Sequence, residues 1–571
     1  MSAWWGEDHA RLAAEKMSIS GLQNEETWLD NVEWSFDDYL RLRSVFDIKI
    51  KDTVHQFVMT YHNTFPSSPP SIAPINNNII SSHQYRNGEL CLEIRPDNWR
   101  PEFDGADMIR SAYKLLSIEN TDELENATIA PSAHQVTHSM ATRFAVGRFY
   151  VTKEVKDVLL DNAPDITRAT FAQQYIGSKN LVIHLVELET EDWAWKSKLP
   201  PSTFKEEAYT VNGKMIRLSI ETEEFCKKIN ENNLTDIMLL QEEKNDDNWL
   251  RLIITSDNEI LLIKKFPGSE NPSLYTTIYS SSKEVDRTGI QIEDLSEKKI
   301  AIVGLGSIGS KIATILARSG VSKFELIDDD ILHHENLVRH DADWRDVGMH
   351  KADVVARRLR LISSNIEVNV RKTAIGAQVS ATEAGNVDVA ISNCYLVIDA
   401  TANPHVFNHL AGIISKSRST LVWGGVYAGG IGGYIARSRT KQDPGPYVIR
   451  DGLNEFYSTV DAKPPVADSR DYQGEESDKV LIASDAQVSV IASHMANLAI
   501  DSIVNVTNSE FGDHAYIIGL TSRWDFVGVF DTRPIHVSEE ICEKVVDEHS
   551  SEDAKDFVND LIKKKLDELK N

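Results

Sequence analysis

Apolar and polar residues alternate along two stretches near the start of the chain. Residues 45–51 and 55–61 place apolar side chains at about every second position, which predicts half-buried antiparallel strands. Further on, the continuous apolar runs at 300–303 and 324–327 are typical of strands that are buried on both faces. Between these runs, residues 310–319 have apolar residues at helical spacing. The pattern therefore changes from antiparallel strands to a strand–helix–strand unit.

The remaining pattern is weaker but still predicts individual elements. Apolar runs predict further strands at 181–188, 250–255, 260–263, 421–423, 524–526 and 529–530. Helical spacing predicts helices at about 404–416 and 484–505. Residues 440–483 are polar and contain four prolines, so we expect a long loop there.

Three glycines follow the first buried run. Gly304, Gly306 and Gly309 have G-x-G-x-x-G spacing between the predicted strand and helix. In that setting the glycines permit a tight turn, the approach of backbone N–H groups to a phosphate, and close packing of helix on strand. Asp328 ends the second run, 19 residues after Gly309, where a carboxylate can hydrogen-bond a ribose hydroxyl. We interpret this unit as nucleotide-binding, because a merely structural glycine turn does not explain Asp328.

Further polar and charged side chains follow Asp328. Asp330, Asn336, Arg339 and Lys351 all lie within the 24 residues that begin at Asp328. A nicotinamide enzyme does not need cations beyond the ribose, whereas a triphosphate site needs them to stabilise phosphate charge. The pattern favours a nucleoside triphosphate, and a solvated charged loop is the alternative.

This run resembles the adenylating domain of ubiquitin-activating enzymes and their bacterial ThiF-like relatives. Their pattern is G-x-G-x-x-G, then D-x-D, N-x-x-R and a lysine. The resemblance implies a Rossmann-like domain that adenylates a C-terminal carboxylate with ATP. It also implies that Asp328 holds the ribose beside Asp330, and that Asn336, Arg339 and Lys351 contact the phosphates.

The resemblance has a departure at the expected metal site. The family follows its next strand with D-x-T-D-N, in which the second acid helps to hold Mg²⁺. Here Asp399 is present, but Ala402 stands where the second acid is expected. We expect either that Asp399 serves as the metal ligand or that phosphates and water hold most of the Mg²⁺.

The N-terminal region contains three short motifs in a fixed order. They are F-P-x-x-P-P at 65–70, H-x-Y-x-x-G-x-x-C-L at 83–92 and W-x-P at 99–101, and a predicted helix follows. This order resembles ubiquitin-conjugating enzymes and implies that Cys91 forms the thioester. A thiolate is the nucleophile that such chemistry needs. The alternative is a small buried cysteine, which is the commoner fate of a free thiol.

The conjugating-type motif departs from its family at one place. His83-Gln84-Tyr85 stands where that family has H-P-N, so the asparagine that stabilises the oxyanion is missing. His83 either donates a hydrogen bond to the oxyanion or fixes the loop, and the residues do not decide between these roles.

Four cysteines occur, far apart in sequence, so no C-x-x-C zinc site is present. Cys394 immediately precedes a core strand and is expected to be buried, and Cys226 lies on a predicted helix and is expected to be structural. If the activating half has its own thioester cysteine, Cys542 is the candidate by elimination.

Length and charge limit the possible functions. The 571 residues are enough for several domains, and the net charge of −27 argues against general nucleic-acid binding. The start of the chain does not resemble a signal peptide, and no long apolar run occurs, so we expect a cytoplasmic protein without a membrane segment.

Together these features predict a multidomain α/β protein. We expect a ubiquitin-conjugating-like α+β domain at 1–145, an α/β linker domain at 146–285 and a Rossmann-like ThiF-type adenylation domain at 286–571. Adenylation, thioester relay through Cys542 and Cys91, and transfer to a target amine would follow in that order.

The fused arrangement resembles the ancillary conjugating proteins of bacterial CBASS anti-phage systems. That resemblance implies the C-terminal tail of a cGAS-like nucleotidyltransferase (CD-NTase) as partner, and adenylating domains of this type imply a homodimer. The alternatives are conjugation of another ubiquitin-like modifier, sulfur-carrier adenylation in cofactor biosynthesis, a nicotinamide oxidoreductase, and an N-terminal half that only binds ubiquitin-type proteins.

Overall fold

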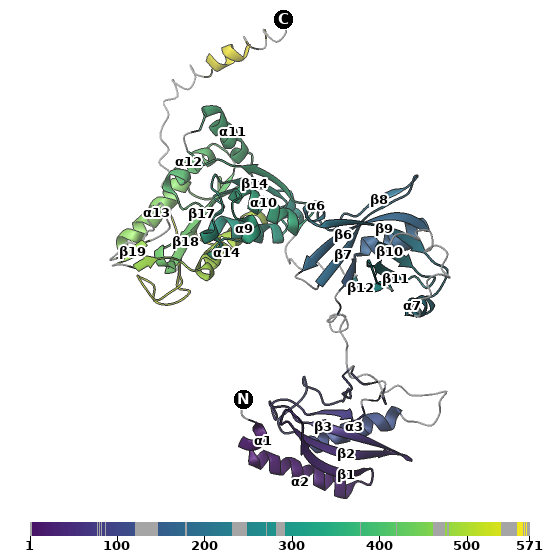
Figure 1. Ribbon diagram of the computed structural model, residues 1–571. Helices are drawn as coiled ribbons and strands as arrows, with labels where there is room; N and C mark the ends of the chain where they lie inside the picture. The colour runs from purple at the N-terminus through teal and green to yellow at the C-terminus, as the bar shows by residue number, and fades with distance from the viewer. Residues whose placement is uncertain are drawn as a thin grey trace. The chain divides into compact units, whose positions relative to one another are not determined.

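The computed structural model divides the chain into two compact units, Met1–Phe144 and Ala145–Asn571 (Figure 1). The predicted domain boundary at 285 lies outside the described residues. The structure describes residues 3–76, 78, 80–81, 83–85, 87–119, 145, 147–176, 180–230, 248–269, 271–280, 292–376, 379–417, 419–460, 474–476, 479–537, 555, 557–563, 565 and 567.

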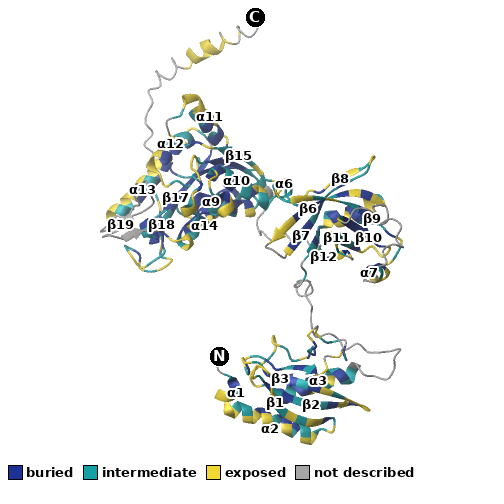
Figure 2. Cartoon of the chain, in the orientation of Figure 1, coloured by how far each residue is buried: buried dark blue, intermediate teal, exposed yellow. Residues whose placement is uncertain are grey.

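The first unit is a four-stranded antiparallel sheet that packs against helices. The strands follow in the order β1 (Leu29–Phe36), β2 (Leu42–Ile50), β3 (Thr53–Thr60) and β4 (Ser71–Pro74). Buried and partly exposed residues alternate along β2, which confirms the predicted half-buried strands. The helices are α1 (Trp4–Glu7), α2 (His9–Glu25) and α3 (Gly105–Glu119). Phe46, Phe57 and Ile109 are fully buried in the shared core. Figure 2 shows that buried and exposed stretches alternate along the strands and helices of this unit.

The second unit begins with an eight-stranded sheet. Its order is β5-β12-β11-β10-β9-β6-β7-β8, and β5 also pairs with β7, so the sheet joins to itself. The strands are β5 (Gly147–Val151), β6 (Ile166–Ile176), β7 (Asn180–Glu189), β8 (Ala194–Lys196), β9 (Tyr209–Arg217), β10 (Trp249–Ile254), β11 (Ile260–Lys265) and β12 (Ser273–Tyr279). Short helices accompany them: α5 (Lys153–Asp157), η1 (Val158–Asn162), α6 (Ser202–Glu207) and α7 (Thr222–Asn230).

A second eight-stranded sheet forms the remainder of this unit. The strand order is β15-β14-β13-β16-β17-β18-β21-β22, parallel from β15 to β17 and antiparallel from β17 onward. The strands are β13 (Lys299–Val303), β14 (Lys323–Ile327), β15 (Glu367–Arg371), β16 (Leu396–Asp399), β17 (Thr420–Val426), β18 (Gly432–Ser438), β21 (Ala515–Gly519) and β22 (Thr532–Ile535). β13 and β14 coincide with the two apolar runs, which confirms those predictions.

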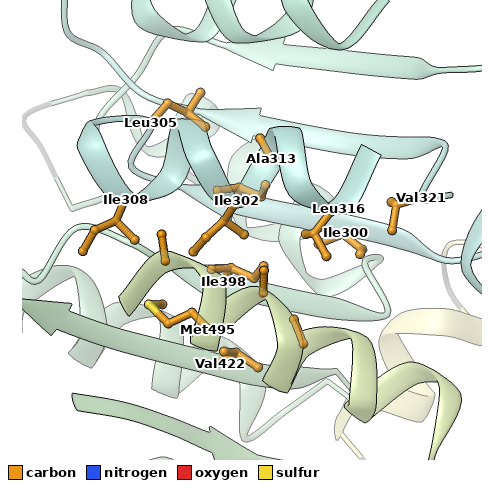
Figure 3. Packing of buried hydrophobic residues seen from close by; sticks show 14 of the residues in the cluster. Ile300, Ile302, Leu305, Ile308, Ala313, Leu316, Val321, Ile398, Val422 and Met495 are labelled. Atoms are coloured by element: carbon orange, nitrogen blue, oxygen red, sulfur yellow. The ribbon is translucent and has the colours of Figure 1, made fainter. Parts of the chain in front are cut away.

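Helices cover both faces of this sheet. On one face, α9 (Ser307–Arg318), α10 (Lys351–Ile362) and α14 (Asp485–Val504) share a core with alternate residues of the central strands, including Ile300, Ile302 and Ile398 (Figure 3). On the other face, α11 (Ala381–Ser392), α12 (Pro404–Ile414) and α13 (Pro446–Thr459) pack over Ala301 and Val397. This part of the chain also contains α8 (Ile292–Ser296) and three short 3₁₀ helices, η4 (His334–Val338), η5 (Trp344–Asp346) and η6 (Ala428–Gly430). A hairpin is formed by β19 (Gly474–Glu476) and β20 (Lys479–Leu481).

Two predictions of local structure are wrong. Residues 446–459 of the expected loop form α13, because Ile449 and Leu453, four positions apart, are buried on one face. Residues 524–526 and 529–530, expected as strands, lie in turns and irregular chain in which Trp524 and Phe530 have positive φ angles of 60° and 66°. The Trp524 ring packs against the Tyr427 ring, with 5.5 Å between the ring centroids, and against the Phe526 ring, with 5.0 Å between the centroids.

Candidate functional site

A cavity of about 470 Å³ opens at the carboxyl ends of the parallel strands. Its walls come from the segments that follow β13, β14, β15, β16 and β17, where an open parallel sheet commonly binds ligands. Its volume lies in the range typical of small-molecule sites, about 300–1,000 Å³. The structure brings most of the expected nucleotide residues to this cavity: Gly304, Gly306, Asp328, Asp330, Asn336, Arg339 and Lys351.

The three glycines of the turn lie in different structural environments. Gly304 has a φ of +82°, which strongly favours glycine. A Cβ on Gly309 would stand 1.9 Å from the Gly304 carbonyl oxygen, so this glycine allows helix and turn to touch. A Cβ on Gly306 would meet nothing within 4 Å, so this position borders open space. Gly306 is also the N-cap of α9, and it leaves the first N–H groups of the helix without a capping side chain.

Asp328 is fixed by the backbone around it. Its carboxylate accepts hydrogen bonds from the N–H groups of Leu305 at 2.6 Å and Asp330 at 2.9 Å. Burial raises the pKa of Asp328, and these hydrogen bonds oppose that rise. The acid therefore links the glycine turn to the end of β14 and still lines the cavity.

Two cationic side chains, Arg339 and Lys351, line the cavity. Lys351, which is 9% exposed, forms an ion pair with Asp330. Burial would raise the pKa of Asp330, but Lys351 outweighs it and lowers that pKa. Arg339 makes no ion pair or side-chain hydrogen bond within the part of the chain that the structure describes. Its guanidinium is therefore available to an anion in the cavity.

Asn336 has a structural role as well as a place in the cavity wall. Its side-chain oxygen accepts a hydrogen bond from the His333 N–H at 3.0 Å and closes the first turn of η4. Asn336 thus fixes the short helix that carries Arg339 to the cavity, and its expected contact with phosphate stays a prediction.

Asp399 and Ala402 lie at the expected metal position but in different environments. Asp399 is 3% exposed, is not among the residues lining the cavity, and accepts hydrogen bonds from the Thr401 hydroxyl at 2.6 Å and N–H at 3.0 Å. Burial raises the pKa of Asp399 to about 6. Ala402 lines the cavity with a φ of +51°. Among the described residues, no three His, Cys, Asp or Glu side chains form a metal cluster. Metal binding by Asp399 stays a prediction.

His340 is a cavity residue that the sequence analysis missed. Its Nε2 hydrogen-bonds the Leu305 carbonyl at 2.8 Å, and its buried Nδ1 has no hydrogen-bond partner among the described residues. Burial lowers the pKa of His340 to about 4, so the ring is neutral near pH 7. Its position directly after Arg339 was the only signal in the sequence.

The loop that carries Cys91 is tied to the first unit at several points. Leu90 and Leu92, on either side, are 5% and 4% exposed, and the Leu90 N–H donates to the Ile72 carbonyl at 2.8 Å. Trp99 donates to the Pro66 carbonyl at 2.7 Å, so the W-x-P and F-P-x-x-P-P motifs are in contact. Cys91 itself is partly exposed. Burial raises the pKa of its thiol, and a hydrogen bond from Tyr85 partly offsets the rise.

The remaining cysteines differ in accessibility. Cys394 is 3% exposed, and burial raises its pKa to about 11, so its thiol is unreactive. Cys226 is partly exposed in α7. Cys542, the candidate thioester cysteine of the activating half, lies outside the described residues.

Comparison with known proteins assigns the cavity to a family. Residues 281–527 match the ThiF family, and this range contains every residue of the cavity wall. The chain carries a ThiF domain. This confirms the predicted fold of the C-terminal part. The N-terminal part is similar to ubiquitin-conjugating enzymes, which confirms the second resemblance.

The curated relatives cover only parts of the chain. Ubiquitin-conjugating enzyme E2 2 of Mycosarcoma maydis is 31% identical over 84 residues, 15% of this chain and 45% of that protein. The ATP-dependent ubiquitin transferase-like protein Cap2 of Escherichia coli (strain TW11681) is 32% identical over 124 residues, 21% of this chain and 20% of that protein. The matched regions thus span less than half the length of either relative.

Among solved structures, Escherichia coli MccB with ATP aligns with a TM-score of 0.33 and 17% identity, covering 44% of this chain and 68% of MccB. Among the helices that the structure describes, none combines the length and apolar character needed to cross a membrane.

Proposed function

We propose that this protein activates the C-terminal carboxylate of a partner protein with ATP and conjugates it to a target amine. The observation that carries the proposal is the ThiF cavity, because a glycine turn, the acid Asp328 and two cations all line it. The ATP-dependent ubiquitin transferase-like proteins support the same reaction class.

In the adenylation step, a carboxylate oxygen of the partner attacks the α-phosphorus of ATP and pyrophosphate leaves. Asp328 orients the ribose, and the open backbone at Gly306 and the first N–H groups of α9 face the phosphates. Arg339 and Lys351 stabilise the negative charge that develops on them. The leaving pyrophosphate and the adenylate are both anions, so these cations act on both sides of the bond that breaks.

The relay step moves the acyl group to sulfur and then to nitrogen. A cysteine thiolate attacks the adenylate, AMP leaves, and the thioester retains the activation. We assign Cys91 as the conjugating cysteine and Cys542 as that of the activating half. The domain limits at 145 and 285, a homodimeric state, a CD-NTase tail as the partner in anti-phage defence, and Mg²⁺ held at Asp399 and by the phosphates are parts of the same proposal.

A lysine trap tests this proposal. The Cys91→Lys variant is expressed in the source cells with its neighbouring genes, so that a transferred acyl group is captured as a stable amide. Mass spectrometry of the purified protein then identifies any C-terminal residue joined to the new lysine. Cys226→Lys serves as the matched control, because Cys226 is also partly exposed but lies in α7 of the other unit.

The expected result is an adduct at position 91 that is absent from the control and is lost when Arg339→Gln is added. An unmodified lysine at 91 beside active ATP–pyrophosphate exchange would overturn the relay. The adenylating half would then stand alone, as in sulfur-carrier activation.

A further inference from the structure

The loop before Cys91 forms a small antiparallel hairpin. The Cys91 N–H donates to the His83 carbonyl at 2.8 Å, and the Tyr85 N–H donates to the Glu89 carbonyl at 2.8 Å. Gln84 and Leu90 pair directly between these two hydrogen bonds. Gly88, with a φ of +89°, closes the turn by donating to the Tyr85 carbonyl at 2.9 Å. Gln84 holds the hairpin from inside, since its side-chain nitrogen donates to the carbonyls of Asn78 and Gly88.

This pairing decides which side chains share a face with Cys91. Directly opposite residues in an antiparallel pair lie on the same face, and neighbours along each strand alternate. Leu90 is 5% exposed and faces the core, so Gln84 belongs to that side. His83, Tyr85 and Cys91 therefore belong to the outer face. Tyr85 is the diagonal neighbour of Cys91, a separation that an aromatic side chain can bridge.

Tyr85 is placed by this register to reach Cys91. A side-chain hydrogen bond from Tyr85 acts against burial and lowers the pKa of the Cys91 thiol, while 44% of Tyr85 stays exposed. Glu89 and Arg95 also place charges near the phenol. Burial raises the pKa of Tyr85, so the hydroxyl keeps its proton at neutral pH and acts as the donor.

We propose that the Tyr85 hydroxyl is a catalytic hydrogen-bond donor at Cys91, in the place where ubiquitin-conjugating enzymes have an asparagine. In the free enzyme it stabilises the Cys91 thiolate. During transfer it donates to the oxyanion that forms on the carbon bonded to that sulfur, because a donor within reach of the sulfur is also near the oxygen. The second role rests on the proposed function, and the first does not.

The transfer step balances without another reactant. The target amine nitrogen attacks the thioester carbon, and the carbonyl pair moves to oxygen. When the oxyanion collapses, the C–N bond remains and the C–S bond breaks. Sulfur leaves as the thiolate with the bonding pair, and the amine proton passes to solvent. Tyr85 faces both anionic species in this sequence, the oxyanion and the thiolate.

The first experiment measures the thiol alone. The full chain is alkylated with iodoacetamide from pH 6.5 to 10, and mass spectrometry follows the peptide that contains Cys91. The variants are Tyr85→Phe, which keeps the ring, His83→Ala, and Tyr39→Phe as an exposed tyrosine elsewhere in the unit. We expect Tyr85→Phe to move the midpoint to higher pH and to slow the reaction about threefold below it, because thiolate is lost faster than nucleophilicity rises.

The second experiment measures transfer without the adenylating half. Cys91 is acylated in the full chain with the thiophenyl ester of N-acetylglycine, and free lysine then removes the acyl group. We expect Tyr85→Phe to slow this aminolysis about tenfold, less than for a fully buried oxyanion donor because Tyr85 is partly exposed.

A Tyr85→Phe midpoint equal to that of the unsubstituted chain would overturn the thiolate role. Unchanged aminolysis would overturn the oxyanion role, and a loss in His83→Ala alone would transfer it to His83. Neither assay needs ATP or a partner protein, so a failed lysine trap would not mimic either result.

Discussion

Substitutions in the glycine turn can separate an effect on the stability of the fold from an effect on nucleotide binding. Gly306 and Gly309 belong to the same motif, but the space around them differs. A Cβ on Gly309 would lie 1.9 Å from the Gly304 carbonyl oxygen and 3.3 Å from the Ala400 Cβ, whereas one on Gly306 would enter the open cavity. The variants Gly306→Ala and Gly309→Ala therefore add the same methyl group to two different environments.

The two methyl groups have different expected effects on the free energy of unfolding. At 309 the added carbon overlaps backbone that cannot rotate away, and such overpacking costs about 1–3 kcal/mol or more. At 306 the N-cap preference for glycine over alanine and the lower entropy of the unfolded alanine chain act in opposite directions. Each is about 0.5–1 kcal/mol, so the net change is close to zero.

Thermal unfolding of the full chain with and without ATP measures both effects. Bound ligand stabilises the folded state by about 2.7 kcal/mol when its concentration is 100 times Kd. If the methyl group at 306 weakens ATP binding tenfold, the same ATP concentration gives about 1.4 kcal/mol. We expect Gly306→Ala to keep its Tm without ATP and to lose about half of the ATP-induced gain.

Either variant can refute this reasoning. A Gly306→Ala protein with the full ATP-induced gain would show that no phosphate approaches this backbone. A Gly309→Ala protein with an unchanged Tm would show that α9 is not held against the turn as the structure has it.

Three further predictions concern the same cavity. Arg339→Gln is expected to abolish ATP–pyrophosphate exchange with little loss of stability. The control Arg345→Gln removes an exposed ion pair with Asp343, in which nitrogen and oxygen are 2.6 Å apart, and is expected to leave exchange intact. Equal losses of exchange in both variants would contradict the role assigned to Arg339. Ala402→Asp, at a φ of +51° that aspartate tolerates better than alanine, is expected to lower the Mg²⁺ concentration that half-saturates the ATP-induced rise in Tm, and an unchanged midpoint would refute this. His340 is protonated near pH 6.5 in the unfolded chain but only near pH 4 in the folded chain, so the stability that neutral His340 contributes is lost as the pH falls from 6.5 towards 4. We expect a loss of about 1 kcal/mol in the free energy of unfolding between pH 8 and 6. The variant His340→Gln should remove this part of the pH dependence of Tm.

The sequence predicts the centre of the ThiF domain well because local pattern and function coincide there. Continuous apolar runs need cover on both faces, so β13 and β14 follow directly from them. The glycine spacing then fixes the direction of α9, and the carboxyl ends of parallel strands meet at one edge of the sheet. Asp328, Arg339 and Lys351 could therefore be expected in one cavity before any tertiary contact was known.

The prediction fails where tertiary contacts decide the local structure. Polar residues are frequent in α13 and obscure the helical spacing of the buried Ile449 and Leu453. Ile449 is fully buried because it packs against the sheet, which the local sequence does not reveal. The segments 524–526 and 529–530 contain aromatic and β-branched side chains, but Trp524 and Phe530 have left-handed backbone angles that do not fit a strand. Asp399 has the expected spacing, yet its carboxylate is buried, accepts hydrogen bonds from Thr401 and does not line the cavity.

The two departures from the family motifs have different physical consequences. At 402 an alanine replaces an acid, and the described residues offer no metal cluster in compensation, so oxygen ligands for Mg²⁺ would have to come mainly from ATP and water. At 83–85 the expected asparagine is missing, but the phenol of Tyr85, from the same hairpin, interacts with the Cys91 sulfur. The adenylating site can rely on the charge of its own substrate. The proposed conjugating site could not do so, because a thioester brings no charge that offsets the oxyanion. A protein donor would therefore be needed at Cys91, whereas an acid can be absent at 402.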